Sequence, residues 1–193
     1  MSTAEDPHYR RILAAIQSEL WAITPEALHQ IIAIAQGVNQ SPEAVAAALG
    51  RPLENTRTVT QRDSVAVVPV TGPIFRYANL FTQISGATSV QQLALDFSAA
   101  LNNPAVSAIV LEIDSPGGQV AGIAELAQMI HAAGKPVVSY VSNLGASAGY
   151  WLAAAGSEVV VSDTAILGSL GAVLRVSDIN GEFKRISAHG SDA

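Results

Sequence analysis

The sequence has no cysteine, only two lysines and few aromatic residues among its 193 positions. Absence of cysteine is typical of proteins in a reducing compartment, so we expect a cytoplasmic location. The formal net charge at pH 7 is -6, and no basic cluster is longer than Arg10-Arg11. A protein that neutralises phosphates needs a basic surface, so this charge balance argues against a nucleic-acid binder.

Long apolar runs and metal-ligand clusters are also missing from the sequence. No stretch of about 18 uncharged apolar residues occurs, which predicts no membrane-spanning helix. The N-terminus lacks the cationic and then apolar pattern of a secretory signal. No group of histidine, aspartate or glutamate has the spacing of metal ligands, and no phosphate-binding loop is present. We therefore expect no metal and no other cofactor.

The sequence is rich in apolar residues, which make up 49% of it, whereas charged residues make up 13%. This composition allows a sizeable core, and the length suits one medium domain with a small appendage. We expect residues 1–50 to be a helical leader and residues 51–63 a polar linker. Apolar spacing and cap residues predict three short helices in the leader. These are Tyr9–Trp21, a helix from Thr24-Pro25-Glu26 to near Gly37, and one from Ser41-Pro42-Glu43 to Gly50.

From Ser64 onward, short apolar runs alternate with amphipathic stretches. This alternation predicts an α/β domain over residues 64–193, with repeated right-handed β-α-β units and a mainly parallel sheet. The predicted elements are strand Val65–Val70, helix Thr88–Leu101, strand Ala108–Ile113, helix Ala121–Ala133, strand Val137–Val141, helix Ala148–Ala155 and strand Glu158–Ser162.

Two segments at predicted strand ends carry most of the chemistry. Asp114-Ser-Pro-Gly-Gly118 follows the second strand, and Asn143–Ser147 follows the third, with Ser147 at the start of a helix. Functional groups of such sheets gather where strands end and helices begin. Either segment alone is a common turn or cap, but their order and their separation by one helix and one strand point to a shared site.

Ser147 is the candidate nucleophile of that site. The neighbouring small residues Ala146, Ala148 and Gly149 leave room for a substrate carbonyl. Adjacent glycines let a backbone approach a ligand and turn its N–H groups outward. The N–H of Gly117 or Gly118, together with that of Ala148, could therefore stabilise the oxyanion of an acyl-transfer transition state.

Three motifs resemble the signatures of signal peptide peptidase A-type serine peptidases, and within them the phage and prophage head-maturation proteases of the lambda protein C-like group. They are Asp114-Ser-Pro-Gly-Gly118, Gly145-Ala-Ser-Ala-Gly-Tyr150 and Gly168-Ser-Leu-Gly171. The resemblance covers residues 64–178, and the Tyr9–Leu28 stretch also resembles the N-terminal leader of many prophage members.

This resemblance implies a ClpP/crotonase-like fold and a Ser–Lys dyad, with Ser147 as nucleophile and Ser169 as the serine that positions the lysine. It further implies a protein or peptide substrate, with capsid or scaffold protein as the candidate, and a homo-oligomer. The location implied is the bacterial host cytoplasm or the prohead.

The general base is the difficult member of the dyad. A lysine can activate a serine if burial lowers its pKa. Lys135 precedes the third strand, at the opposite end of the sheet from Ser147, and is expected to be a solvated turn residue. Lys184 follows the Gly168–Gly171 motif, but the family lysine comes later, on a turn after another strand. Phe183–Ala188 resembles that strand, so we expect the base beyond Ala193 rather than at Lys184.

Three alternative functions remain open at this point. ClpP has the same fold and a Ser-His-Asp triad, but no histidine falls between Ser147 and His189, and His189 lies in a polar tail. A crotonase-type acyl-CoA enzyme would share the oxyanion hole, with Glu125 as a weak candidate for its carboxylate. A peptidase fold without its base would instead serve as a non-catalytic scaffold or assembly protein.

Overall fold

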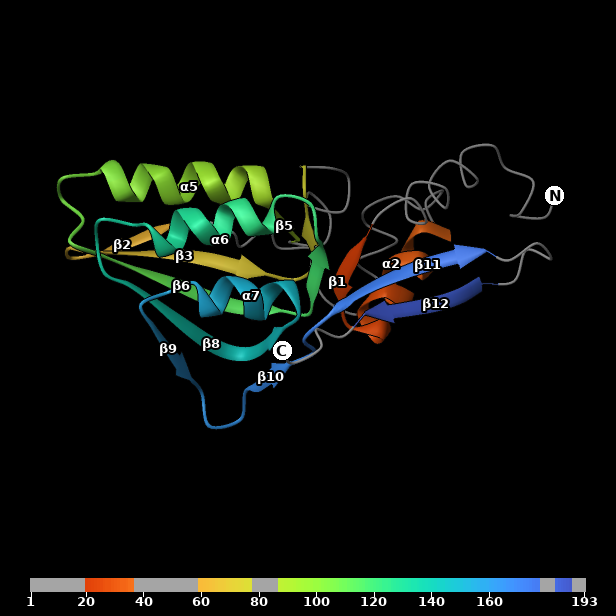
Figure 1. Ribbon diagram of the computed structural model, residues 1–193. Helices are drawn as coiled ribbons and strands as arrows, with labels where there is room; N and C mark the ends of the chain where they lie inside the picture. The colour runs from red at the N-terminus through yellow and green to blue at the C-terminus, as the bar shows by residue number, and fades with distance from the viewer. Residues whose placement is uncertain (1–19, 37–58, 78–86, 178–182, 189–193) are drawn as a thin grey trace.

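A computed structural model describes residues 20–36, 59–77, 87–177 and 183–188 (Figure 1). One sheet forms the centre of the domain. Across the sheet its strands are β10 (Ile166–Gly168), β8 (Val137–Ala146), β6 (Ala108–Ser115), β3 (Val65–Thr71) and β2 (Thr60–Arg62). The β3–β6, β6–β8 and β8–β10 pairs are parallel. β9 (Glu158–Val161) also pairs in parallel with β8, whereas β2 is antiparallel to β3. This topology confirms the predicted mainly parallel sheet.

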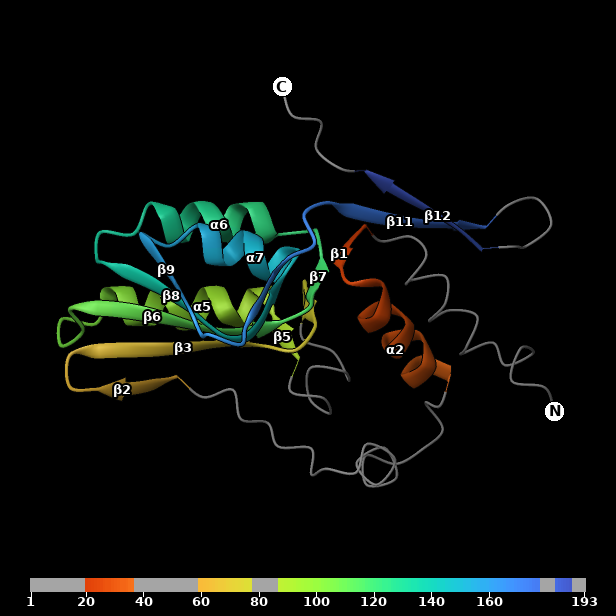
Figure 2. The same cartoon turned by 90° about the horizontal axis from the view of Figure 1, so that it is seen from below.

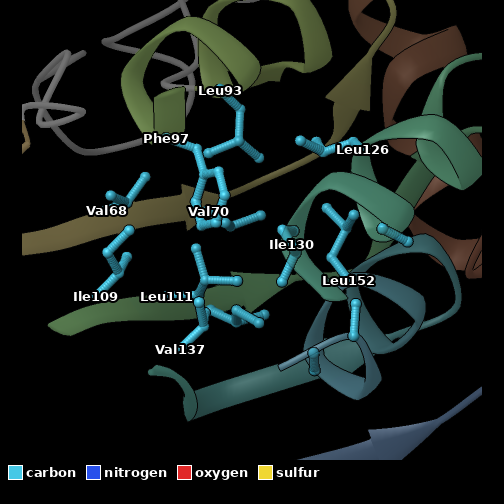
Figure 3. Close-up of a cluster of buried hydrophobic side chains, with 14 of the residues drawn as sticks. Val68, Val70, Leu93, Phe97, Ile109, Leu111, Leu126, Ile130, Val137 and Leu152 are labelled. Carbon is cyan, nitrogen blue, oxygen red and sulfur yellow. The ribbon is translucent and has the colours of Figure 1, made fainter. Parts of the chain in front are cut away.

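Three helices pack against this sheet: α5 (Val90–Asn102), α6 (Ile123–His131) and α7 (Ala148–Ala154). Their apolar faces and the sheet enclose one core, shown in Figure 3. Phe97 of α5, Leu111 of β6 and Leu152 of α7 are fully buried in it. The connections β3-α5-β6, β6-α6-β8 and β8-α7-β9 are the predicted β-α-β units, and burial of these apolar faces drives their packing.

A second sheet lies beside the carboxyl ends of the central strands (Figures 1 and 2). It is built from short strands that are far apart in the sequence. Across the sheet they are β12 (Phe183–Ala188), β11 (Ala172–Ser177), β1 (Trp21–Ile23), β7 (Gly117–Gln119), β4 (Ile74–Phe75) and β5 (Thr88–Ser89). The strand predicted at Phe183–Ala188 is therefore confirmed.

The N-terminal part of the chain differs from the helical prediction in one respect. The second predicted helix is confirmed as α2 (Pro25–Gln36), with the Ala27 N–H donating to the Thr24 hydroxyl at 3.4 Å. Trp21, expected to end the first helix, lies instead in strand β1, because its backbone pairs with two strands of the second sheet. The rest of the first helix and all of the third lie outside the described residues.

Part of the predicted linker is a strand. Thr60–Arg62, expected within the linker, forms β2, because it pairs antiparallel with the edge of β3; residues 51–58 lie outside the described residues. In the part of the chain that the structure describes, no helix is long and apolar enough to cross a membrane.

Candidate active site

Ser147 lies between the last residue of β8 and the first residue of α7, as the sequence predicts. Its backbone has φ 53° and ψ −114°, a conformation that residues with a side chain rarely adopt. Such strain persists only where the surrounding structure enforces it, and it clusters at functional sites. Serine nucleophiles of α/β-hydrolases occupy a similarly strained strand-to-helix turn, which presents the hydroxyl.

Hydrogen bonds fix the Ser147 backbone and side chain. Its N–H donates to the Gly168 carbonyl at 2.9 Å, and its carbonyl accepts from the Trp151 N–H at 2.9 Å in the first turn of α7. The hydroxyl donates to the Gly171 carbonyl at 3.2 Å. The third sequence motif, Gly168–Gly171, is therefore brought directly against Ser147.

Within that third motif, Ser169 has φ 55° and its side chain is exposed. The flanking Gly168 and Gly171 also have positive φ angles, of 141° and 137°. This turn links β10 to β11, so it joins the central sheet to the second sheet. The structure thus places Ser169 on the turn that contacts Ser147.

The two glycines after Pro116 form strand β7 rather than only a turn. Gly117 has φ 99°, and a Cβ there would clash with the Ala22 carbonyl oxygen and lie 3.0 Å from the Ser147 Cβ. A Cβ on Gly118 would clash with the backbone of Ile74. Only glycine therefore allows β7 to pass between its neighbours and against Ser147.

Ser115 is a residue of the site that the sequence reasoning missed. It is fully buried, and its hydroxyl donates to the Gly72 carbonyl at 2.7 Å and accepts from the Gly117 N–H at 3.2 Å. It also packs against the start of α7, where a Cβ on Gly149 would lie 3.0 Å from the Ser115 carbonyl oxygen. The only available sequence signal was its place inside the Ser-Pro-Gly-Gly motif.

The hydrogen bonds around β7 distinguish its two glycines. The Gly117 N–H is engaged by Ser115, as described above. The Thr24 N–H donates to the Pro116 carbonyl at 3.0 Å, and the Val120 N–H donates to the Leu20 carbonyl at 2.9 Å. In an antiparallel pair of strands, every second residue directs its N–H toward the partner strand. Gly118 lies two residues before Val120, so its N–H also points toward β1. Gly118 is thus the glycine whose N–H faces β1, opposite Ala22.

The two lysines of the sequence lie in different parts of the fold. Lys184 lies in β12 in register with Val176, and its side chain is outside what the structure describes. Lys135 lies in the turn before β8, as predicted, but it is half-buried rather than fully solvated, because its ammonium donates to the Asn103 carbonyl at 2.7 Å and to the Ala100 carbonyl at 3.3 Å. It therefore caps the end of α5.

The residues named for the alternative functions are not brought to Ser147 by any described contact. Glu125 lies in the first turn of α6 with its side chain exposed. His189 lies outside the described residues.

Comparison with known proteins identifies relatives of this chain. The model of peptidase family S49 matches residues 130–189, which include Ser147 and the Gly168–Gly171 turn. The chain is 30% identical over 131 residues to capsid assembly protease C of Escherichia phage lambda, covering 67% of this chain and 30% of that protein. It is 30% identical over 173 residues to head-tail preconnector protein GP5 of Enterobacteria phage P21, covering 88% of this chain and 34% of that protein. The chain thus spans about a third of the length of these two relatives.

Solved structures that align with part of this chain include a probable enoyl-CoA hydratase from Mycobacterium thermoresistibile, with a TM-score of 0.46 and 16% identity over 57% of this chain and 51% of that chain. Another is a membrane-bound stomatin-specific protease in complex with a substrate peptide, with a TM-score of 0.46 and 22% identity over 64% of this chain and 50% of that chain.

Proposed function

We propose that this chain is a serine endopeptidase of the signal peptide peptidase A type that processes capsid or scaffold proteins of a phage or prophage. Its similarity to the model of peptidase family S49, to capsid assembly protease C of phage lambda and to head-tail preconnector protein GP5 of phage P21 supports this proposal. The observation that carries the proposal is the position of Ser147. It lies at a strained strand-to-helix junction, with the glycine strand β7 packed against its Cβ.

The proposed reaction follows from these contacts. The Ser147 Oγ attacks the carbonyl carbon of the peptide bond, and a base takes its proton. The oxyanion accepts hydrogen bonds from the N–H groups of Gly118 and Ala148; Gly117 is left out because its N–H is held by Ser115. Each donor of this kind contributes roughly 3–4 kcal/mol to transition-state stabilisation. The C–N bond then breaks, the base returns the proton to the amine, and water hydrolyses the acyl-serine.

We propose a lysine as the base of this reaction. A lysine that loses its proton near neutral pH can activate a serine hydroxyl. Lys184 of β12 is the candidate within the sequence. Ser169 positions that lysine. It lies on the same turn as Gly171, whose carbonyl accepts a hydrogen bond from the Ser147 hydroxyl.

A homo-oligomer is part of the same proposal. Exposed apolar side chains gather on β9, on β10 and on the turn after β10, and they include Val160, Ile166 and Leu170. Ile166 and Leu170 are 67% and 65% exposed. Apolar groups gathered at one edge of a sheet are typical of a surface that packs against another subunit.

The test is co-expression with the capsid and scaffold proteins of the phage or prophage that encodes this chain. We expect cleaved products, mapped by mass spectrometry, that disappear in Ser147→Ala and persist in the control Ser162→Ala. Identical products from Ser147→Ala would overturn the proposal.

A further inference from the structure

Strand β1 occupies an unusual place in the second sheet. It comes from the N-terminal part of the chain, yet it lies between β7 and β11 and is antiparallel to both (Figures 1 and 2). Its register pairs Trp21 with Gln119, Ala22 with Gly118 and Ile23 with Gly117. All three of its residues are buried. A segment remote in sequence is thus held by backbone pairing on both of its edges.

The middle residue of β1 lies beside the nucleophile. The Ala22 carbonyl oxygen and the Ser147 Cβ both lie close to Gly117. A Cβ on Gly117 would clash with that oxygen and lie 3.0 Å from the Ser147 Cβ. The Gly118 N–H, one of the two proposed oxyanion donors, is directed toward β1 at Ala22. The backbone of Ala22 therefore stands where the carbonyl of a peptide substrate has to lie for attack by Ser147.

Ser147 is only 6% exposed in this arrangement. An external peptide cannot reach its hydroxyl unless a covering element moves. β1 is a short element held by backbone pairing, by its packing in a small cluster with Phe75 and Ala87, and by the edge-on contact of Trp21 with Phe75, whose ring centroids lie 6.0 Å apart. In contrast, α7 packs into the central core through Leu152 and Ala153, and core elements open only at free energies near that of global unfolding.

We infer that β1 is an internal occupant of the peptide-binding groove, which an external peptide must displace to reach Ser147. The catalytic consequence rests on the proposed serine peptidase function, whereas the occupancy itself does not. Peptides commonly bind by adding a strand to a sheet, with main-chain hydrogen bonds for affinity and side-chain pockets for specificity. In the described structure β1 makes that type of contact from within the same chain.

The occupant also indicates the class of peptide that the groove accepts. Side chains alternate along a strand, so Trp21 and Ile23 share one side and Ala22 faces the other. Trp21 and Ile23 are buried in an apolar cluster, at 1% and 2% exposure. The groove thus suits an extended segment with a small residue beside Ser147 and bulky apolar residues on either side of it.

A reversible lock on β1 tests this inference. Leu20 and Val120 are opposite one another, joined by the Val120 N–H to Leu20 carbonyl bond of 2.9 Å. Their Cα atoms are about 5.5 Å apart if the pair is regular, a separation that a disulfide spans. Because the chain has no cysteine, Leu20→Cys with Val120→Cys creates a single disulfide that a reductant opens. The wild-type chain treated with the same reductant is the control.

The first readout is peptide binding in a Ser147→Ala background, which needs no catalysis. The probe is a fluorescein-labelled synthetic peptide with the sequence of residues 18–26 of this chain. We expect fluorescence anisotropy to give binding at least about tenfold weaker for the oxidised than for the reduced pair. Equal binding in both states, or binding in neither, would overturn the inference.

The second readout, with Ser147 intact, is the rate of labelling by a fluorophosphonate. We expect slow labelling when the pair is oxidised, faster labelling when it is reduced, and faster labelling still for Trp21→Ala, which removes the ring contact with Phe75. Leu20→Ala, at a half-exposed neighbouring position, is the matched control and should label like the wild type. Labelling unaffected by the lock would contradict the inference. State-dependent peptide binding with no labelling in any form would instead refute the peptidase proposal and leave the occupancy of the groove supported.

Discussion

Gly117 and Ser147 are packed so closely that a Cβ at residue 117 would lie 3.0 Å from the Cβ of Ser147. Gly117 also has φ 99°, which a residue with a side chain adopts only under strain. The segments that follow β6 and β8 therefore meet at these two residues. This contact links the glycine motif to the serine motif.

Gly117→Ala should impair both stability and reactivity. The added methyl group clashes with the Ala22 carbonyl and crowds Ser147, so we expect a loss of about 1–3 kcal/mol in the free energy of unfolding. Urea denaturation measures this loss. Gly134→Ala is the control, because a Cβ there meets nothing within 4 Å, and it should change stability by less than about 0.5 kcal/mol. Equal stabilities of the two variants would contradict the described packing.

Ser147→Gly should be more stable than Ser147→Ala, although both lack the hydroxyl and should be inactive. Glycine tolerates the positive φ of 53° at this position, and we expect a gain of about 1 kcal/mol over alanine. The comparison uses thermal and urea unfolding. Ala148→Gly, one residue further into the regular helix, should have the opposite sign. A less stable Ser147→Gly would mean that the turn is not strained.

Ser115→Ala should slow fluorophosphonate labelling of Ser147 and lower stability by about 1–3 kcal/mol, since it leaves the Gly72 carbonyl and the Gly117 N–H unpaired. The matched control is Ser107→Ala at an exposed site, where we expect a change within about 0.5 kcal/mol. Labelling at the wild-type rate in Ser115→Ala would exclude a role for this hydroxyl in positioning β7.

Ser139→Ala should stabilise the protein. Its hydroxyl is fully buried and has no hydrogen-bond partner among the described residues, so its removal should add about 1 kcal/mol. Ser157→Ala provides the contrast, because the Ser157 hydroxyl donates to the Val137 carbonyl at 2.7 Å and its loss should cost about 1 kcal/mol. Urea midpoints that shift in the same direction for both variants would contradict this assignment.

The central domain was predictable from sequence because its signals are local. Continuous apolar runs such as Val65–Val70 and the amphipathic helices around Phe97 and Leu152 give the period and burial of each element. The junction at Ser147 follows from the change of period between β8 and α7. β8 itself runs to Ala146, beyond the predicted Val141, because its second half pairs with β10.

The features missed by sequence reasoning depend on contacts between remote residues. Trp21–Ile23 is too short to show a strand period, and the apolar spacing before it is helical. Pairing with β7 and β11 makes it a strand. The role of Ser115 likewise requires Gly72, 43 positions away in the sequence. The identity of the base stays a prediction, since the Lys184 side chain lies outside what the structure describes.

The central claim is that Ser147 is the nucleophile of this site. The most direct measurement is peptide mapping of the protein after reaction with a fluorophosphonate, using wild type, Ser147→Ala and the control Ser142→Ala. We predict one covalent adduct, on Ser147, that is retained in Ser142→Ala and absent from Ser147→Ala. An adduct on another serine that persists in Ser147→Ala would contradict the account.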